Sequence, residues 1–279
     1  MLKLVLYFFS IFSFTDIVNN ALSLPEHFGH SRFLSVNTLH PKNTNFTYFT
    51  FTQAWPTTVC LQGEEEHHKC NRVLNVTGWT IHGLWPSGGS SKEGPEECNK
   101  TAEFNSSAVA PLLKELQMYW PNLYIDTAAN GFWEHEWFKH GTCAASVKQT
   151  ANEYLYFLQG LTLYKEINLT NVMAEVGIVP DDDKQYDVYK ILTSLKNKLN
   201  GIEPVISCFK SKRDGKFYLD QMEICYSKDF EMVDCTQQRT NTLTFRSLKD
   251  ILKPETSDRH LQNCPKEGFV YYPTVHGTV

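Results

Sequence analysis

The sequence lacks several features that define common classes of protein. It contains no internal repeat and no low-complexity tract, so neither a repeat array nor a disordered chain is expected. Basic residues are not in excess, because 26 lysines and arginines stand against 31 aspartates and glutamates, for a formal net charge of −5. A broad basic surface that grips nucleic acid by charge alone is therefore not indicated, and any polyanion would have to be held in a local pocket.

Long apolar runs are scarce as well, and the one that exists lies at the N-terminus. Lys3 precedes an apolar run over residues 4–14, interrupted only by serines, and Ala21-Leu22-Ser23 offers a cleavage site with small residues. The run is shorter than the roughly 20 residues that span a membrane, and no second run follows. We predict a signal peptide over residues 1–23, no membrane span, and a secreted mature chain over residues 24–279, with lysosomal or endosomal delivery left open. A retained signal anchor is the alternative.

The eight cysteines include no Cys-x-x-Cys pair, which disfavours zinc binding by thiolates. An even number of cysteines behind a secretory leader indicates four disulfides. Local spacing predicts the pairs Cys60–Cys70 and Cys225–Cys235 and leaves the other pairing open. Five glycosylation sequons agree with passage through the secretory pathway, and we expect several of them to be used: Asn45, Asn75, Asn99, Asn105 and Asn168.

Helical and strand-like patterns are mixed along the chain without the regular alternation of a parallel βαβ sheet. Apolar residues at helical spacing predict helices over residues 108–119, 152–167 and 187–199. Strand-like runs cover residues 45–55, 78–86, 205–210, 216–226, 242–246 and 268–272. We predict an α+β fold: a single domain with a mainly antiparallel central sheet flanked by helices and stapled by disulfides.

Two charged segments are expected to be surface turns or loops. The segment from Cys60 to Cys70 contains His67-His68, but no third ligand follows at helical or hairpin spacing, so a solvated loop is favoured over a metal site. The three aspartates at 181–183 resemble a calcium-binding run, yet such runs are more often solvated turns that lead into a helix. We assign no function to either segment.

Residues 132–143 place four titratable side chains within six consecutive positions. On a helix with about 100° per residue, His135, Glu136, Lys139 and His140 share one side, and aromatic residues face the core. Two imidazoles, a carboxylate and an ammonium suit an acid–base site that handles an anion. The alternative is a solvated helix face with i,i+4 pairs. Gly141 is expected to end this helix.

A further candidate residue, His82, lies in the strand predicted over residues 78–86. With a period of two, His82 shares a face with Thr80 and Leu84, while Gly83 on the other face permits a close approach beside it. The alternative is a core histidine whose hydrogen bonds are satisfied by its neighbours.

The segments WTIHGLWP (79–86) and FWEHEWFKHGTC (132–143) together resemble the paired active-site motifs of the T2 family of secreted ribonucleases. The likeness extends over most of the mature chain, including the order of the cysteines. It implies one T2-like catalytic domain over residues 24–279 and the pairs Cys98–Cys143 and Cys208–Cys264. It also implies an endoribonuclease that needs no metal or other cofactor.

By the same resemblance, His140 is the base, His82 is the acid, and Glu136 and Lys139 polarise and stabilise the phosphate that His135 binds. The residue types suit this chemistry because single-stranded RNA carries its own nucleophile in the 2′-OH. The enzyme then has only to remove that proton, stabilise the phosphorane and protonate the 5′-oxygen, which gives a 2′,3′-cyclic phosphate. DNA lacks the 2′-OH and is not expected to be a substrate.

Base recognition is where the chain departs from the family. Trp85 can stack on a base, but many T2 members carry an aspartate after the Trp-Pro of the first motif, and here the residue is Ser87. A hydroxyl is a weaker acceptor than a carboxylate, so we expect a flatter base preference. We expect a monomer.

Two other classes of function stay open from the sequence. The first is a zinc hydrolase, but its second histidine stands at i+5 from His135, whereas a His-Glu-x-x-His site requires i+4. The second is a secreted binding protein that keeps the scaffold without catalysis. Measuring the hydrolysis of single-stranded RNA separates these alternatives.

Overall fold

The structure of the chain, a computed structural model, describes residues 45–71, 76–89, 94–236, 238 and 260–275. The predicted signal peptide, the sequon at Asn75 and the strand predicted over residues 242–246 lie outside these ranges. Within them, no helix is both long enough and apolar enough to cross a membrane.

The fold is organised around β1 (Tyr48–Ala54), every residue of which is buried. Its neighbours are β2 (Thr80–Ser87) and β5 (Phe217–Tyr226), and the sheet continues from β5 through β4 (Val205–Lys210) to β7 (Leu261–Gln262). β8 (Phe269–Tyr272) joins β5 and β3 (Asp181–Asp187), and β6 (Met232–Val233) also pairs with β5. All pairings are antiparallel except β4 with β7 and β5 with β8. The predicted α+β class is confirmed.

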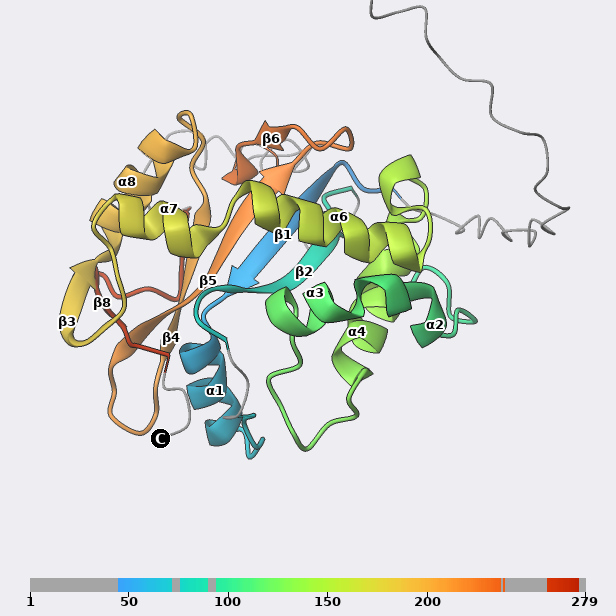
Figure 1. The fold of residues 1–279 in the computed structure, drawn as a ribbon. Helices are drawn as coiled ribbons and strands as arrows, with labels where there is room; N and C mark the ends of the chain where they lie inside the picture. The colour runs from blue at the N-terminus through green and yellow to red at the C-terminus, as the bar shows by residue number, and fades with distance from the viewer. Residues whose placement is uncertain (1–44, 72–75, 90–93, 237, 239–259, 276–279) are drawn as a thin grey trace, which may run out of the picture. The chain divides into compact units, whose positions relative to one another are not determined.

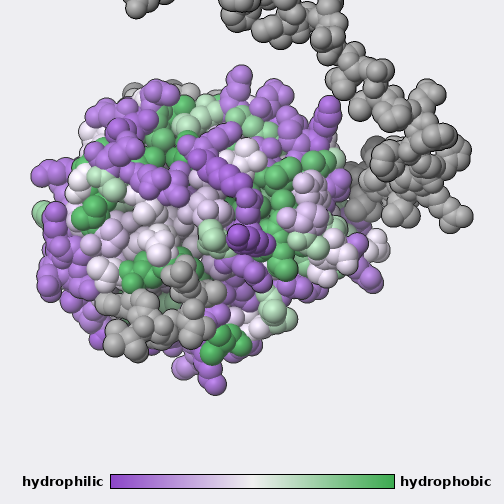
Figure 2. Space-filling model, in the orientation of Figure 1, coloured by the Kyte–Doolittle hydropathy of each residue, from purple (hydrophilic) through white to green (hydrophobic). Residues whose placement is uncertain are grey.

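Helices surround this sheet, and α6 and α7 cross one of its faces (Figure 1). The helical segments are α1 (Pro56–Glu65), α2 (Ser106–Val109), η1 (Ala110–Leu112), α3 (Leu113–Tyr119), α4 (Gly131–Glu136), η2 (Trp137–Gly141), α5 (Thr142–Ala144), η3 (Lys148–Thr150), α6 (Glu153–Glu166), α7 (Leu169–Glu175) and α8 (Val188–Lys198). Asn152, Asn168 and Asp187 cap α6, α7 and α8 through their side-chain oxygens, which satisfies backbone N–H groups at the helix starts. The face seen in Figure 2 is mostly hydrophilic, with separate small apolar patches.

Three segments differ from their sequence-based interpretation. The segment expected as a loop from Cys60 begins inside α1, which starts with Pro56 at a position where a missing N–H costs nothing. The aspartate run begins β3, where Asp181 pairs with Tyr272 of β8 and Asp182 accepts hydrogen bonds from Thr274. The expected turn is kept within this irregular strand, because the backbone N–H groups of Asp183 and Lys184 donate to Oδ1 of Asp181. α7 was not predicted, since only two of its seven residues, Leu169 and Met173, are buried.

Four disulfides fasten the fold, and they join Cys60–Cys70, Cys98–Cys143, Cys208–Cys264 and Cys225–Cys235. These are the pairs given by local spacing and by the family resemblance. The four described sequon asparagines lie at exposed or partly exposed positions: Asn45, Asn99, Asn105 and Asn168. Their glycosylation stays a prediction.

Candidate active site

The motif over residues 132–143 is not a single α-helix. α4 ends at Glu136, the next five residues form the π-helical turn η2, and α5 follows. Gly141 was expected to end the helix, which is wrong, because it keeps helical backbone angles and the chain continues into α5. A side chain at Gly141 would overlap the ring of Trp137, so the glycine serves packing instead of termination. Single π-turns within helices are frequent at functional sites.

The π-turn changes which side chains meet. A π-turn closes i to i+5, so the rings of His135 and His140 lie with their centroids 6.4 Å apart. The sequence predicts that the two histidines share one side of a helix, and the π-turn brings their rings closer than α-helical geometry would. Donor atoms of His135, Glu136 and His140 all lie within 4.8 Å of one another. The i+5 spacing therefore does not by itself argue against a metal ligand set.

A β-bulge turns His82 into the same site. Thr52 pairs with Gly83 and Gln53 pairs with Ile81, so His82 is the extra residue on β2. The strict alternation predicted for this strand is wrong at that point, because a bulge re-aims the side chain. As a result, the imidazole of His82 meets the indole of Trp85 edge-on, with ring centroids 5.0 Å apart.

Buried aromatic residues with polar tips hold the two motifs together. The indole N–H of Trp120 donates to the carbonyl of His82 at 3.0 Å, and that of Trp133 donates to the carbonyl of Trp120 at 2.7 Å. From α6, the hydroxyl of Tyr156 donates to the carbonyl of Leu84 at 3.0 Å. Each of these groups buries apolar area and satisfies a buried donor, so the bulged strand and α4 are fixed relative to each other.

Gln221 on β5 orients His82, and no local pattern predicts this contact because the two residues are 139 positions apart in the chain. The side-chain oxygen of Gln221 lies 2.9 Å from Nδ1 of His82. An amide oxygen can only accept, so Nδ1 carries a hydrogen and Nε2 is left for chemistry.

Glu136 is the most deeply buried titratable group of the site, with 1% of its surface exposed. Burial raises its pKa to about 8, against the smaller effects of a hydrogen bond from Trp85 and of the charge on Lys139. The Trp85 indole N–H donates to Oε2 at 2.9 Å. Any side chain at Gly83 would overlap both partners, which explains the glycine in the motif.

The pKa values of the three imidazoles are also shifted, but they are lowered instead of raised. Burial lowers the pKa of His140 to about 3, and the charges of Lys139, His135 and His82 act in the same sense. Burial likewise lowers the pKa of His82, opposed by its hydrogen bond to Gln221. The pKa of His135 at the rim is lowered by desolvation and by Lys139.

Two further features lie around these groups. The ammonium of Lys139 lies 3.3 Å from a carboxylate oxygen of Glu96 at the surface of the site. A cavity of about 180 Å³ opens beside His82, and its wall includes Tyr124, Phe132 and Gln221. The site thus combines a cation, three imidazoles, a buried carboxyl and an adjoining cavity with aromatic walls.

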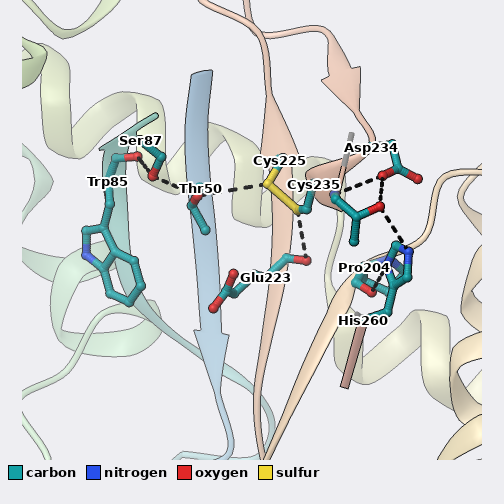
Figure 3. Close-up of a disulfide and its surroundings, with 10 residues drawn as sticks. Thr50, Trp85, Ser87, Pro204, Glu223, Cys225, Asp234, Cys235 and His260 are labelled. Atoms are coloured by element: carbon teal, nitrogen blue, oxygen red, sulfur yellow. Dashed lines mark hydrogen bonds between the residues drawn. A yellow bond between two sulfur atoms is a disulfide. The ribbon is translucent and has the colours of Figure 1, made fainter. Parts of the chain in front are cut away.

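Ser87 is not turned toward this cavity. It is 6% exposed, and its hydroxyl lies 3.0 Å from the carbonyl oxygen of Trp85 and 2.8 Å from Oγ1 of Thr50 (Figure 3). Because the carbonyl only accepts, Ser87 donates to it and accepts from Thr50. The contact between Ser87 and a base stays a prediction that this geometry does not support.

His68 is not a simple solvated loop residue. Its ring stacks on Tyr124, with centroids 4.7 Å apart, and its Nδ1 lies 3.1 Å from Asp126. It therefore supports the segment that lines the cavity beside His82. His67 next to it is exposed.

Replacing Glu136 by glutamine should raise the free energy of unfolding at pH 7 by about 3 kcal/mol. The folded-state pKa of Glu136 is raised from 4.5 to about 8, so the folded protein binds more protons between these values, and stability falls as pH rises through this window. An amide carries no such cost, and its oxygen can still accept from Trp85. Urea unfolding at pH 7 and pH 4 checks this, because the gain should vanish at pH 4. A gain that is equal at both pH values would contradict the buried-acid assignment.

The chain is similar to known proteins in both sequence and structure. The sequence model of the Ribonuclease T2 family matches residues 46–235. Ribonuclease Oy from Magallana gigas is 39% identical over 233 residues, which are 83% of this chain and 98% of that protein. Ribonuclease T2 from Danio rerio is 34% identical over 240 residues, 85% of this chain and 90% of that protein. The crystal structure of human RNase T2 superposes with a TM-score of 0.60 at 28% identity, covering 82% of this chain and 99% of that one.

These matches define a class of RNA-cleaving enzymes with an α+β fold. The chain belongs to the ribonuclease T2 family, and it is an endoribonuclease of the T2 type.

Proposed function

We propose that this protein is a secreted, metal-independent endoribonuclease that cleaves single-stranded RNA through a 2′,3′-cyclic phosphate, with His140 as the base and His82 as the acid. One observation carries the proposal: imidazoles from two elements, η2 and β2, flank a single indole. The ring of Trp85 lies 5.0 Å from that of His82 and 5.3 Å from that of His140. Acid and base therefore sit on separate rigid supports around one space.

In this mechanism His140 removes the proton of the 2′-OH. Its pKa of about 3 keeps the imidazole neutral over the whole working range. The 2′-oxygen then bonds to phosphorus, and the bond from phosphorus to the 5′-oxygen breaks as Nε2 of His82 gives its proton to that oxygen. Water hydrolyses the cyclic phosphate in the reverse sense, to a 3′-phosphate.

The remaining groups stabilise charge on the phosphorane. Glu136 stays protonated near neutral pH, so it can donate a hydrogen bond to a phosphoryl oxygen while Oε2 accepts from Trp85. Lys139 supplies a positive charge, and His135 at the rim binds the phosphate. The cavity beside His82 receives the nucleotide next to the scissile phosphate, where Tyr124 and Phe132 offer aromatic faces.

The decisive experiment is hydrolysis of a single-stranded RNA with and without excess EDTA, beside a DNA of the same sequence. We expect equal RNA cleavage in both buffers, a cyclic phosphate product, and intact DNA, because DNA lacks the nucleophile. Loss of activity in EDTA would favour metal-assisted hydrolysis at His135, Glu136 and His140, whose donor atoms lie within 4.8 Å. RNA binding without cleavage would instead favour the catalytically silent protein.

The pH profile of kcat/KM should be a bell with its maximum in the acidic range. The base His140 is lost only below a pKa of about 3, while the acid His82 is lost above a pKa that burial lowers from 6.5. We expect the rate to fall about tenfold per pH unit on the alkaline side. Initial rates on a dinucleotide measure this, and a flat profile between pH 4 and 9 would be incompatible with two histidines in opposite protonation states.

Secretion and the oligomeric state of the mature chain are part of the same proposal. We propose that residues 1–23 are removed during secretion and that the mature chain acts as a monomer.

A further inference from the structure

A second group of metal-ligating side chains lies at the other edge of the central sheet. β2, which carries His82, is at one end of the strand order and β7 is at the other. Near β7, donor atoms of Glu203, Asp234 and His260 all lie within 4.8 Å of one another. Figure 3 shows Trp85 and Ser87 on one side of β1 and β5 and His260 with Asp234 on the other. None of these three residues takes part in the RNA-cleaving mechanism.

The three residues come from separate segments that the sheet brings together. Glu203 precedes β4, Asp234 follows β6, and His260 precedes β7. β4 and β7 pair in parallel, with Ile206 opposite Leu261, which places the start of one strand beside the start of the other. The position of the cluster is therefore fixed by backbone pairing.

The imidazole of His260 is oriented in the way that metal-binding histidines usually are. The residue is 6% exposed, and Nδ1 lies 3.2 Å from the carbonyl oxygen of Pro204. A carbonyl only accepts, so Nδ1 carries a hydrogen and the backbone sets the ring orientation. Nε2 then points at Oε2 of Glu203, at 2.7 Å, with the Thr236 hydroxyl 3.3 Å away.

Both carboxylates are held in place as well. Oδ1 of Asp234 accepts from the backbone N–H of Thr236 at 2.9 Å and from its hydroxyl at 2.7 Å. The ammonium of Lys196 holds Oε1 of Glu203 at 2.7 Å, while Oε2 faces His260. Supporting hydrogen bonds of this kind fix ligand orientation and strengthen metal binding.

We propose that Glu203, Asp234 and His260 bind one zinc ion. Two carboxylate oxygens and one imidazole nitrogen are ligands that zinc accepts, and the two negative charges match its charge. Bonds of about 2 Å in a tetrahedral arrangement separate ligand atoms by roughly 3.3 Å. The 2.7 Å contact between Glu203 and His260 then has to widen by about 0.6 Å, and the other donor atoms, which lie within 4.8 Å of one another, have to approach by at most about 1.5 Å. Water or the Thr236 hydroxyl completes the coordination. The ion fastens the starts of β4 and β7 to the segment after β6 and leaves the cleavage chemistry unchanged.

The test is thermal unfolding of the EDTA-treated, then desalted protein with increasing zinc chloride. We expect the midpoint to rise by roughly 5 °C or more at a free zinc concentration of about one hundred times Kd. His260→Gln and Glu203→Gln should each abolish this rise and still cleave RNA in EDTA. His67→Asn, which changes an exposed histidine outside the cluster, should keep the full rise.

A further variant distinguishes zinc binding at His260 from zinc binding at the catalytic histidines. His140→Ala removes one donor of the other candidate cluster, so it should retain the zinc-dependent rise if the ion binds at His260. Equilibrium dialysis should give one zinc per chain in His140→Ala and none in the His140→Ala, His260→Gln double variant. A rise that persists in His260→Gln, or no rise in the wild type, would overturn the proposal and leave a hydrogen-bonded pair of His260 and Glu203.

Discussion

Alanine in place of either His82 or His140 is expected to lower kcat on RNA by about 10²- to 10⁴-fold. His82 is the proposed proton donor to the 5′-oxygen, and His140 is the proposed acceptor from the 2′-OH. Because they act in one concerted exchange of protons, the double variant should lose little more than either single variant. Single-turnover rates on a dinucleotide measure both effects.

The matched control for these variants is His67→Asn. His67 is exposed and has a positive φ of 73°, a conformation that asparagine tolerates better than alanine. We expect it to keep full activity. Circular dichroism and thermal unfolding should show that all variants are folded. Full activity in both His82→Ala and His140→Ala would refute the catalytic assignment, whatever the motifs resemble.

Removing the disulfide between Cys98 and Cys143 by a double alanine replacement is expected to cost about 2 to 5 kcal/mol of unfolding free energy. The bridge spans 45 positions in sequence and joins the segment before α2 to α5. The same segment reaches the catalytic turn through two more contacts: the N–H of Glu97 donates to the carbonyl of Lys139 at 2.9 Å, and Glu96 pairs with the Lys139 ammonium at 3.3 Å. We therefore expect activity to fall along with stability. Urea unfolding and RNA hydrolysis of the same samples measure the two effects.

The pair Cys60–Cys70 provides the comparison, because it closes only 10 positions. Loop-closure entropy grows with loop length, so its removal should cost less stability than removal of Cys98–Cys143. It lies away from the η2 turn, so kcat should stay near that of the wild type at low temperature. Any loss of activity should appear in KM, because Cys70 forms a β-bridge with Tyr124 in the wall of the cavity beside His82. Equal stability losses from the two bridges, or unchanged activity and stability without Cys98–Cys143, would contradict this account.

The sequence by itself determined the class of fold and the residues that converge on the site. Helices such as α6 and α8 and strands such as β4 and β5 follow from local apolar periodicity, which depends only on neighbouring residues. The two motifs and the order of the cysteines indicated the family, because these sequence features can be recognised even where the predicted fold is wrong. α7 was not predicted because it is a short helix that begins with a side-chain cap at Asn168. β3 was not predicted because it forms by pairing with β8, which is distant in the sequence.

Only the tertiary structure decided how the side chains of the site are oriented and which of them are protonated. The bulge at His82 depends on register with β1, and the partner of its Nδ1 is a glutamine on β5. The π-turn brings the ring centroids of His135 and His140 to 6.4 Å from each other, and Ser87 is turned into the sheet by Thr50. Desolvation raises the pKa of Glu136 to about 8 and lowers that of His140 to about 3. Register, long-range hydrogen bonds and burial are properties of the packed chain, so no local pattern in the sequence encodes them.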